Sequence, residues 1–316
     1  VKDLAAKRLD TPLDPDVAFS DDPLRMVRAA RFVSQLGVSP APRVVEAIER
    51  MRERLAIVSP ERIRDELDKL LVGGSPGAGL TLLVDTGLAD GFIPEVPALR
   101  LEQDPVHRHK DVLRHTFAVI ERLEPDPVLR LAGLLHDIGK PSTRQITADG
   151  VSFHHHEVVG ARMAEHRLRE LRYPNEIVDE VRRLVELHLR FHGYGDGWTD
   201  AAVRRYVRDA GPLLDKLNQL TRADVTTRDP RRAERFRALQ DDLEERIARL
   251  WEQENLDAMR PPLDGRQVME HLGLEPGPLV GEALASLMEV RLERGEIPEE
   301  EAYALLDAWA KERGIG

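Results

Sequence analysis

The chain has 316 residues, of which 41% are hydrophobic and 33% are charged, and this balance is typical of a globular protein. It contains no cysteine, which excludes disulfides, thiolate nucleophiles and cysteine-ligated metal sites and suits a cytoplasmic location. The net charge of −11 argues against non-specific wrapping of nucleic acid, although it permits a local basic surface. No apolar run is long enough to span a membrane, so we expect no membrane partner.

Helical periodicity dominates the sequence and predicts an all-α fold. The first expected helix starts at Ser20–Pro23 and stops at Gly37, and the next opens at Ser59 and ends near Gly73. Further helices are expected near 80–86, 111–123, 127–138, 157–171, 175–189, 199–210, 213–227 and 231–254. The one strand signal is a small β-hairpin, in which 144–147 and 151–153 flank an Asp-Gly turn.

The distribution of prolines and turns predicts three parts. Residues 90–109 contain three prolines and few periodic apolar side chains, so they form a connector. Further turns separate a C-terminal tail. The expected parts are an N-terminal helical region with its connector (1–106), a helical bundle with the hairpin (107–255) and a helical tail (256–316).

Histidines are concentrated in the middle part. Ten of the eleven lie between His107 and His192, where an even distribution would place about three. The pair His136-Asp137 follows an apolar run that should form a buried helix, where an unpaired carboxylate is costly. Either polar partners satisfy this pair or it binds a metal.

The other candidate ligands surround this pair in the sequence, and they are His115, His156, His188 and Asp224. His192 is an alternative to His188. A mixed imidazole and carboxylate set suits Mn, Fe, Co, Ni, Zn or Mg, and one or two such ions activate water for attack on phosphorus. Lys140 lies four residues after His136, on the same side of the helix end, where it is placed to contact a phosphate.

This ordered set resembles the HD superfamily of metal-dependent phosphohydrolases. The segment from His136 to Lys140 is close to that family's usual form, and His156 and His188 fit its extended set of ligands. The resemblance implies an all-helical HD domain with a divalent metal ion (Mg, Mn, Ni, Co or Fe). It also implies a phosphate-ester substrate, with catalytic roles for His136, Asp137 and Lys140.

A second pattern lies in the first expected helix. Asp22, Arg25, Arg28 and Arg31 recur every three residues and would form one ridge of a helix. For an arbitrary helix, the simplest interpretation is a ladder of solvated ion pairs beside an apolar face. The segment Asp21–Phe32 also resembles the neck motif of class II CCA-adding tRNA nucleotidyltransferases, in which (E/D)DxxR is followed by RAARF.

The resemblance to this family extends along the whole chain, and its arginine-rich, HD-bearing form looks actinobacterial. It implies that Asp22 and Arg25 read the base edges of CTP and ATP, with Arg28 and Arg31 contacting the nucleotide or holding the template. Carboxylate and guanidinium groups match the amine and ring acceptor that cytosine and adenine share. It also implies a tail that grips tRNA, with Gly277 at a helix start whose N–H groups suit a phosphate. A Gly-Pro helix start without a ligand is as plausible.

The family's catalytic head, a strand-rich sheet with a Gly-Gly phosphate motif and a metal-binding Asp pair, is not found in this sequence. We therefore expect a neck, HD domain and tail whose parent enzyme adds CCA to tRNA with CTP and ATP. Alone, this chain is not expected to polymerise, because nucleotidyl transfer needs two bound metal ions. The alternatives are a free-standing HD phosphohydrolase acting on nucleotides and a non-catalytic tRNA-binding protein.

Overall fold

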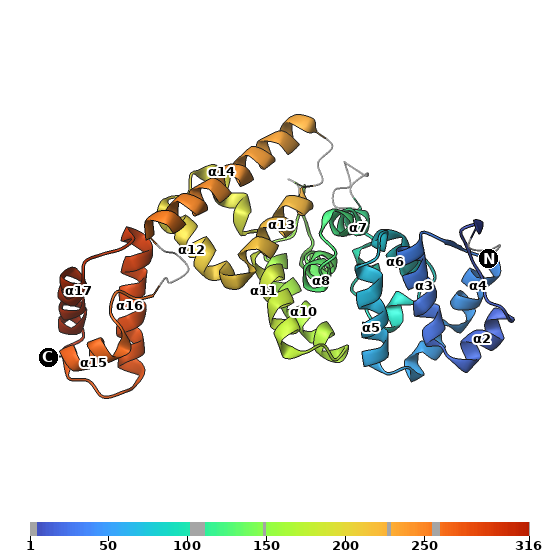
Figure 1. Cartoon of the computed structure of the whole chain (residues 1–316), viewed down its shortest axis with the longest axis horizontal. Coiled ribbons are helices and arrows are strands. Elements are labelled where there is room, and N and C mark those ends of the chain that lie inside the picture. Colours follow the sequence, from blue (N-terminus) through green and yellow to red (C-terminus); the bar gives the residue numbers. More distant parts are fainter. Residues whose placement is uncertain (1–4, 102–110, 148–149, 226–228, 255–259, 316) are drawn as a thin grey trace. The chain divides into compact units, whose positions relative to one another are not determined.

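The computed structural model describes residues 5–101, 111–147, 150–225, 229–254 and 260–315 (Figure 1). The chain divides into two compact units. The first combines Val1–Leu189 with Asp215–Ala233, and the second combines Arg190–Leu214 with Glu234–Gly316. The described residues are mainly helical and contain two small two-stranded sheets, so the all-α prediction is confirmed.

The first unit is a layered helical assembly. Its helices are α2 (Pro15–Asp21), α3 (Leu24–Leu36), α4 (Pro42–Met51), α5 (Pro60–Leu71), α6 (Pro76–Asp85), α7 (Val112–Arg122), α8 (Pro127–Leu135), α9 (Lys140–Thr143), α10 (His156–Glu170), α11 (Asn175–Leu187) and α13 (Leu214–Asp224). Short 3-10 helices are η1 (Arg52–Ile57), η2 (Ala89–Gly91) and η3 (Pro97–Leu99). The expected hairpin is present as antiparallel strands β3 (Gln145–Thr147) and β4 (Gly150–Ser152). A parallel pair, β1 (Arg8–Leu9) and β2 (Ser39–Pro40), was not predicted.

The start of α3 differs from the prediction. Ser20 and Asp21 end the separate helix α2, which Asp14 caps by accepting from the backbone N–H of Asp16. Asp22 lies between the helices in an extended conformation, with φ −146° and ψ 98°. Proline disfavours helical geometry in the residue before it, and Pro23 follows Asp22 directly. Asp22 therefore does not share a helix with Arg25, and the prediction that both lie on one helix was wrong, whereas the predicted stop at Gly37 is confirmed.

Helix α3 is the centre of the N-terminal packing. Its buried face, which includes Met26, Val27 and Ala30, lies against α5 and α6 (Figure 1). The approach of α6 is close, because a Cβ placed on Gly79 would lie 2.7 Å from the carbonyl oxygen of Ala30. Glycine at this position is therefore what allows the two helices to cross.

Helix α8 joins the N-terminal helices to the histidine-bearing ones. All of its residues from Val128 to Leu135 are buried, including Arg130. The guanidinium of Arg130 donates to the carbonyl oxygens of Leu71 and Gly73 at the end of α5, and to those of Leu123 and Glu124 after α7. The guanidinium of Arg130 therefore donates hydrogen bonds to four carbonyl groups that have no donor within the two helices that end there.

The second unit carries the tail. Its elements are η4 (Arg190–Asp196), α12 (Asp200–Ala210), η5 (Gly211–Leu213), most of α14 (Pro230–Glu254), α15 (Gly265–Leu272), α16 (Pro278–Arg294) and α17 (Glu299–Glu312). A separate core forms where α15, α16 and α17 pack, around Leu287, Leu306 and Trp309. Among the described residues, no helix is long and apolar enough to cross a membrane.

Candidate metal centre and nucleotide template

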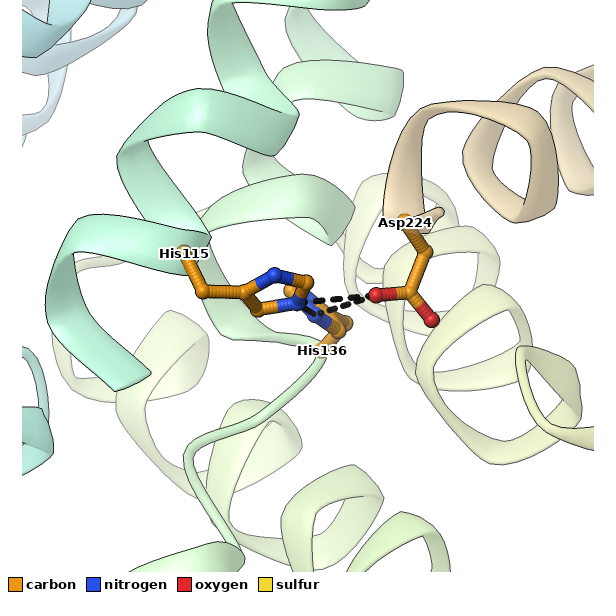
Figure 2. Close-up of side chains that lie close together, drawn as sticks. All are labelled: His115, His136 and Asp224. Atoms are coloured by element: carbon orange, nitrogen blue, oxygen red, sulfur yellow. Dashed lines mark hydrogen bonds and ion pairs between the residues drawn. The ribbon is translucent and has the colours of Figure 1, made fainter. Parts of the chain in front are cut away.

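The candidate ligands lie at the ends of helices in the first unit. His115 projects from α7, while Asp224 is the last residue of α13 (Figure 2). His136 and His188 directly follow α8 and α11, and His156 is the first residue of α10. Together with Asp137, these side chains form two groups, in each of which the ligand atoms lie within 4.8 Å of one another.

The first group consists of His115, His136 and Asp224. The Oδ1 atom of Asp224 lies 2.8 Å from Nε2 of His115 and 3.5 Å from Nε2 of His136. Figure 2 shows both rings directed at this oxygen, and their Nε2 atoms are 3.4 Å apart. Two imidazoles and a carboxylate thus converge as the ligands of one metal ion do.

The second group consists of Asp137, His156 and His188, and it is more deeply buried. Nε2 of His156 lies 3.3 Å from Oδ1 of Asp137, and the two imidazole rings are 5.4 Å apart. The Nε2 atoms of His156 and His188 are buried without a hydrogen-bond partner in the structure. Buried polar atoms normally have partners, so these two fit a bound ligand in the space they face.

Three of the histidines are oriented by the same backbone contact. The Nδ1 atoms of His136, His156 and His188 lie 2.6–2.8 Å from the carbonyl oxygens three residues earlier. A carbonyl only accepts hydrogen bonds, so each Nδ1 carries a proton and donates it. The opposite nitrogen, Nε2, is directed at the site, which is the arrangement of metal-binding histidines.

Asp137 lies between the two groups. Its Oδ2 atom is 3.2 Å from Nε2 of His136 and 3.6 Å from Nε2 of His115, whereas its Oδ1 atom faces His156. The ammonium of Lys140 binds the same Oδ2 atom at 2.7 Å. Lys140 therefore contacts the candidate ligand Asp137 in this structure, and its expected phosphate contact remains a prediction.

The charges of the site favour different protonation states in the two groups. Burial lowers the pKa of His136, but the carboxylates of Asp137 and Asp224 outweigh it and raise the pKa to about 10. Burial lowers the pKa of His188 to about 3, and the neighbouring His136 cation adds to this effect. His188 is thus neutral with a free lone pair, whereas a metal in the first group would displace a proton from His136.

A close backbone contact positions His156. A Cβ placed on Gly139 would lie 2.2 Å from the carbonyl oxygen of His156 and 2.8 Å from the backbone nitrogen of Gly160. The turn after Asp137 therefore touches the first turn of α10 directly. This contact sets the distance between Asp137 and His156, which belong to the same group.

Among the described residues, the other histidines belong to neither group. His154 and His155 are exposed. His192 is exposed in the second unit, where its ring lies 6.1 Å from that of Phe236, and among the described residues it joins neither group. His107 lies outside the described residues, as do the predicted boundaries at 106/107 and 255/256.

The predicted template residues lie around the α2–α3 junction. Arg25 is exposed and donates to the carbonyl oxygen of Ala18 at 3.1 Å. Arg28 and Arg31 do not pair along their own helix. Both guanidinium groups contact the buried carboxylate of Glu66 on α5, and Arg31 also lies over the ring of Phe32. The ladder of solvated ion pairs is therefore not the observed arrangement.

Two residues that contact the predicted template residues, Arg62 and Glu66, were not predicted as functional from the sequence. Arg62, like Glu66, lies on α5, and its Nη2 atom contacts the carboxylate of Asp22 at 3.2 and 3.3 Å. The available signal was the spacing of Arg62 and Glu66, which places opposite charges on one helix face. That signal does not reveal which helix the face meets.

An Asp-x-Asp spacing does occur in the chain, at Asp14 and Asp16. Asp14 caps α2, however, and Asp16 forms an ion pair with Arg50 at 2.9 Å. Neither carboxylate belongs to a potential metal group of the described residues. This pair therefore stabilises the ends of helices.

Comparison with known proteins extends these observations. Residues 37–99 match the family described as "Probable RNA and SrmB- binding site of polymerase A", and residues 112–253 match the HD domain. The second match contains all six candidate metal ligands. The HD domain and the nucleotidyltransferase relatives described next both imply a divalent metal ion.

The chain is 37% identical to an A-adding tRNA nucleotidyltransferase of Deinococcus radiodurans over 92% of its own length and 69% of the relative's. It is 33% identical to a CC-adding tRNA nucleotidyltransferase of Thermus thermophilus, covering 96% of the chain and 70% of that protein. The crystal structure of the Bacillus stearothermophilus CCA-adding enzyme with CTP shares the fold, with a TM-score of 0.66 at 22% identity, over 99% of this chain and 68% of that one. The chain belongs to the CCA-adding tRNA nucleotidyltransferase family.

Proposed function

We propose that this protein serves the addition of the CCA end to tRNA, in whole or in part, in the cytoplasm. The observation that carries the proposal is the 37% identity, sustained over 92% of the chain, to an enzyme that adds A to tRNA. Its proposed partners are tRNA, CTP and ATP. A free-standing HD phosphohydrolase is less well supported, because the relatives match the N-terminal helices and the tail as well as the HD region.

Within this function, we assign the α2–α3 junction to reading the incoming base. Asp22 offers an acceptor and Arg25 offers several donors, which suits the amine and ring acceptor shared by cytosine and adenine. Uracil and guanine present the opposite pattern at the corresponding edge. Arg28 is half-buried and Arg31 is more buried, which fits a supporting role better than direct contact with a base.

The Arg25→Ala substitution tests the template. Nucleotide transfer is measured in a polypeptide that joins this chain to the part of the Deinococcus radiodurans relative outside the match. We expect the preference for CTP and ATP over UTP and GTP to fall about 10- to 100-fold, because a bidentate base contact contributes about 1–3 kcal/mol. Arg43→Ala, which removes an exposed arginine elsewhere in the neck, is the control. Unchanged selectivity in Arg25→Ala would exclude the template role.

The chain alone offers a second test. Its 316 residues are expected to incorporate neither CMP nor AMP into tRNA transcripts ending before C74 or before A76, with any divalent metal. The same preparation is expected to bind tRNA weakly, and filter binding should show affinity falling steeply with salt. The proposed tRNA contacts lie in the neck and in the tail, where exposed Gly277 precedes α16. Incorporation by the chain alone would contradict this division of labour.

For the HD region we propose a metal-dependent phosphohydrolase activity on a phosphate ester. The two groups fit first-row divalent metals, which when bound polarise a phosphate and lower the pKa of water. The backbone contacts of His136, His156 and His188 hold their Nε2 atoms toward the site. We propose that Lys140, whose ammonium binds Asp137, shares its charge with a phosphate. His136, Asp137 and Lys140 remain the proposed catalytic residues.

The proposed organisation keeps the three expected parts, with the neck at 1–106, the HD domain at 107–255 and the tRNA-binding tail at 256–316. An actinobacterial origin also remains a proposal, supported by the excess of arginine in the sequence.

A further inference from the structure

A side chain of α7 holds the helix end that carries Asp224. The Nη1 atom of Arg122 donates to the carbonyl oxygen of Val225 at 2.6 Å and to that of Ala223 at 3.4 Å. These two residues flank Asp224, which is the last residue of α13. The guanidinium therefore binds the backbone on both sides of a candidate metal ligand.

The end of α13 requires a donor of this kind. The last carbonyl groups of a helix have no donor within the helix, and helix ends tend to fray. A cationic side chain at this end also interacts favourably with the negative end of the helix dipole. Arg122 supplies both the donor and the charge from a neighbouring helix, so it stabilises the last turn of α13.

The direction of the Asp224 side chain depends on this backbone. The rings of His136, His156 and His188 are oriented by donating from Nδ1 to nearby carbonyl oxygens. An ionised carboxylate has no proton to donate, so Asp224 cannot make the same contact. Its carboxylate is therefore directed largely by the helix end from which it projects.

Helix α7 contacts both the side chain of Asp224 and the backbone beside it. His115 and Arg122 are seven residues apart, which is close to two helical turns, so they lie on the same side of α7. Nε2 of His115 lies 2.8 Å from Oδ1 of Asp224 (Figure 2), and Arg122 binds the adjacent carbonyl groups. The distance between the two ligands therefore depends on how α7 is joined to the end of α13, and Arg122 joins them.

A second contact fixes α13 nearer its other end. The Nζ atom of Lys216 lies 3.0 Å from both carboxylate oxygens of Asp126, the residue that caps α8. Lys216 is about two turns before Asp224 on α13. This ion pair should keep α13 in place when the exposed side chain of Arg122 is replaced, so that only the last turn loosens.

We infer that Arg122 is a positioning residue of the first metal group, which directs Asp224 toward His115 and His136 by binding the carbonyl groups on either side of it. This inference rests on the proposed metal-dependent function of the HD region. The second group is different, because its ligands belong to the ends of α8, α10 and α11. Metal binding in the second group should therefore not depend on Arg122.

Calorimetric titration of the 316-residue chain with Mn²⁺ tests the inference without relying on activity. The first group is identified as the binding that Asp224→Asn loses. We expect Arg122→Met to weaken this binding about 10- to 100-fold, which is the loss typical of residues that orient metal ligands. Binding that persists in Asp224→Asn belongs to the second group and should be unchanged in Arg122→Met. Arg122→Lys should restore part of the loss, because an ammonium donates but lacks the planar fork.

The matched control is Arg169→Met. It makes the same substitution at an exposed arginine of the first unit, whose guanidinium pairs at 2.7 Å with Glu165 of its own helix, α10. It should leave Mn²⁺ binding unchanged. The melting temperatures of the metal-free variants are measured as well. A merely structural role of Arg122 would lower the melting temperature and leave the Mn²⁺ affinity as it is.

The outcomes are distinguishable. If Asp224→Asn loses binding and Arg122→Met weakens the same binding more than Arg169→Met does, the inference stands. If Asp224→Asn loses binding but Arg122→Met weakens it no more than the control, the inference is wrong and the metal site survives. If Asp224→Asn binds Mn²⁺ as the unsubstituted chain does, the first group is not a metal site. The proposed function of the HD region then fails together with the inference.

Discussion

Replacing Asp137 with alanine is expected to abolish metal binding in both groups of the HD region. Among the described ligands of the two groups, Asp137 alone has oxygens that face both, with Oδ2 near His136 and Oδ1 near His156. Loss of a residue that orients a metal ligand typically lowers metal affinity or activity 10- to 100-fold. Loss of the ligand itself should lower both by more. We therefore expect the proposed phosphohydrolase activity to fall by more than about 100-fold.

Calorimetric titration of the 316-residue chain with Mn²⁺ or Co²⁺ measures this effect without relying on activity. The Asp137→Ala variant removes a carboxylate that is 1% exposed and leaves Lys140 without its anionic partner, so some loss of stability is expected as well. Asp137→Asn, which conserves the volume, separates the two effects. Asp179→Ala, at an exposed position on α11, is the control. Two equivalents of tightly bound metal in Asp137→Asn would show that these groups are not the metal site.

The Gly139→Ala substitution is expected to be the most damaging small change in the first unit. The added Cβ would lie 2.2 Å from the carbonyl oxygen of His156 and 2.8 Å from the nitrogen of Gly160, and both are backbone atoms. No side chain can move to make room, so α10 must shift away from the turn after Asp137. Overpacking of this kind costs about 1–3 kcal/mol and sometimes more.

The shift of α10 should also displace His156 from Asp137. We therefore expect Gly139→Ala to lower the thermal unfolding midpoint and to weaken metal binding in the second group. Gly281→Ala is a matched control, because Gly281 lies inside α16 with nothing within 4 Å of its Cβ position. Alanine favours helix there by up to about 1 kcal/mol, so stability should rise or stay the same. An unchanged midpoint in Gly139→Ala would show that the close contact is not rigid.

Local signals explain which parts of the structure could be predicted. The apolar run before His136 predicted the buried helix α8, and the Asp-Gly turn predicted the hairpin. The convergence of His115 and Asp224, more than 100 residues apart in the sequence, was expected only through resemblance to the HD superfamily. Spacing along one helix cannot show which residues of other helices complete a site.

The wrong predictions for the first expected helix also arose because spacing along one helix does not show contacts with other helices. Asp22 and Arg25 have helical spacing, but Pro23 disfavours helical geometry in the residue before it, so Asp22 is extended and lies outside the helix that carries Arg25. Arg28 and Arg31 appeared to be partners of charges on their own helix, whereas the structure pairs them with Glu66. Glu66 lies 38 residues after Arg28 and 35 after Arg31, so no local sequence pattern identifies it as their partner.

The position of Arg130 bears on how this chain can be divided into fragments. Its guanidinium takes two acceptors from the end of α5 and two from the segment after α7. A second hydrogen bond joins the same two regions with donor and acceptor reversed, since Glu121 of α7 accepts from the backbone N–H of Gly77 at 2.8 Å. Excision of the HD region at residue 106 would leave a buried guanidinium short of acceptors and a carboxylate short of a donor. Gene fusions and domain swaps in this family should therefore carry α5 and α6 together with α7 and α8.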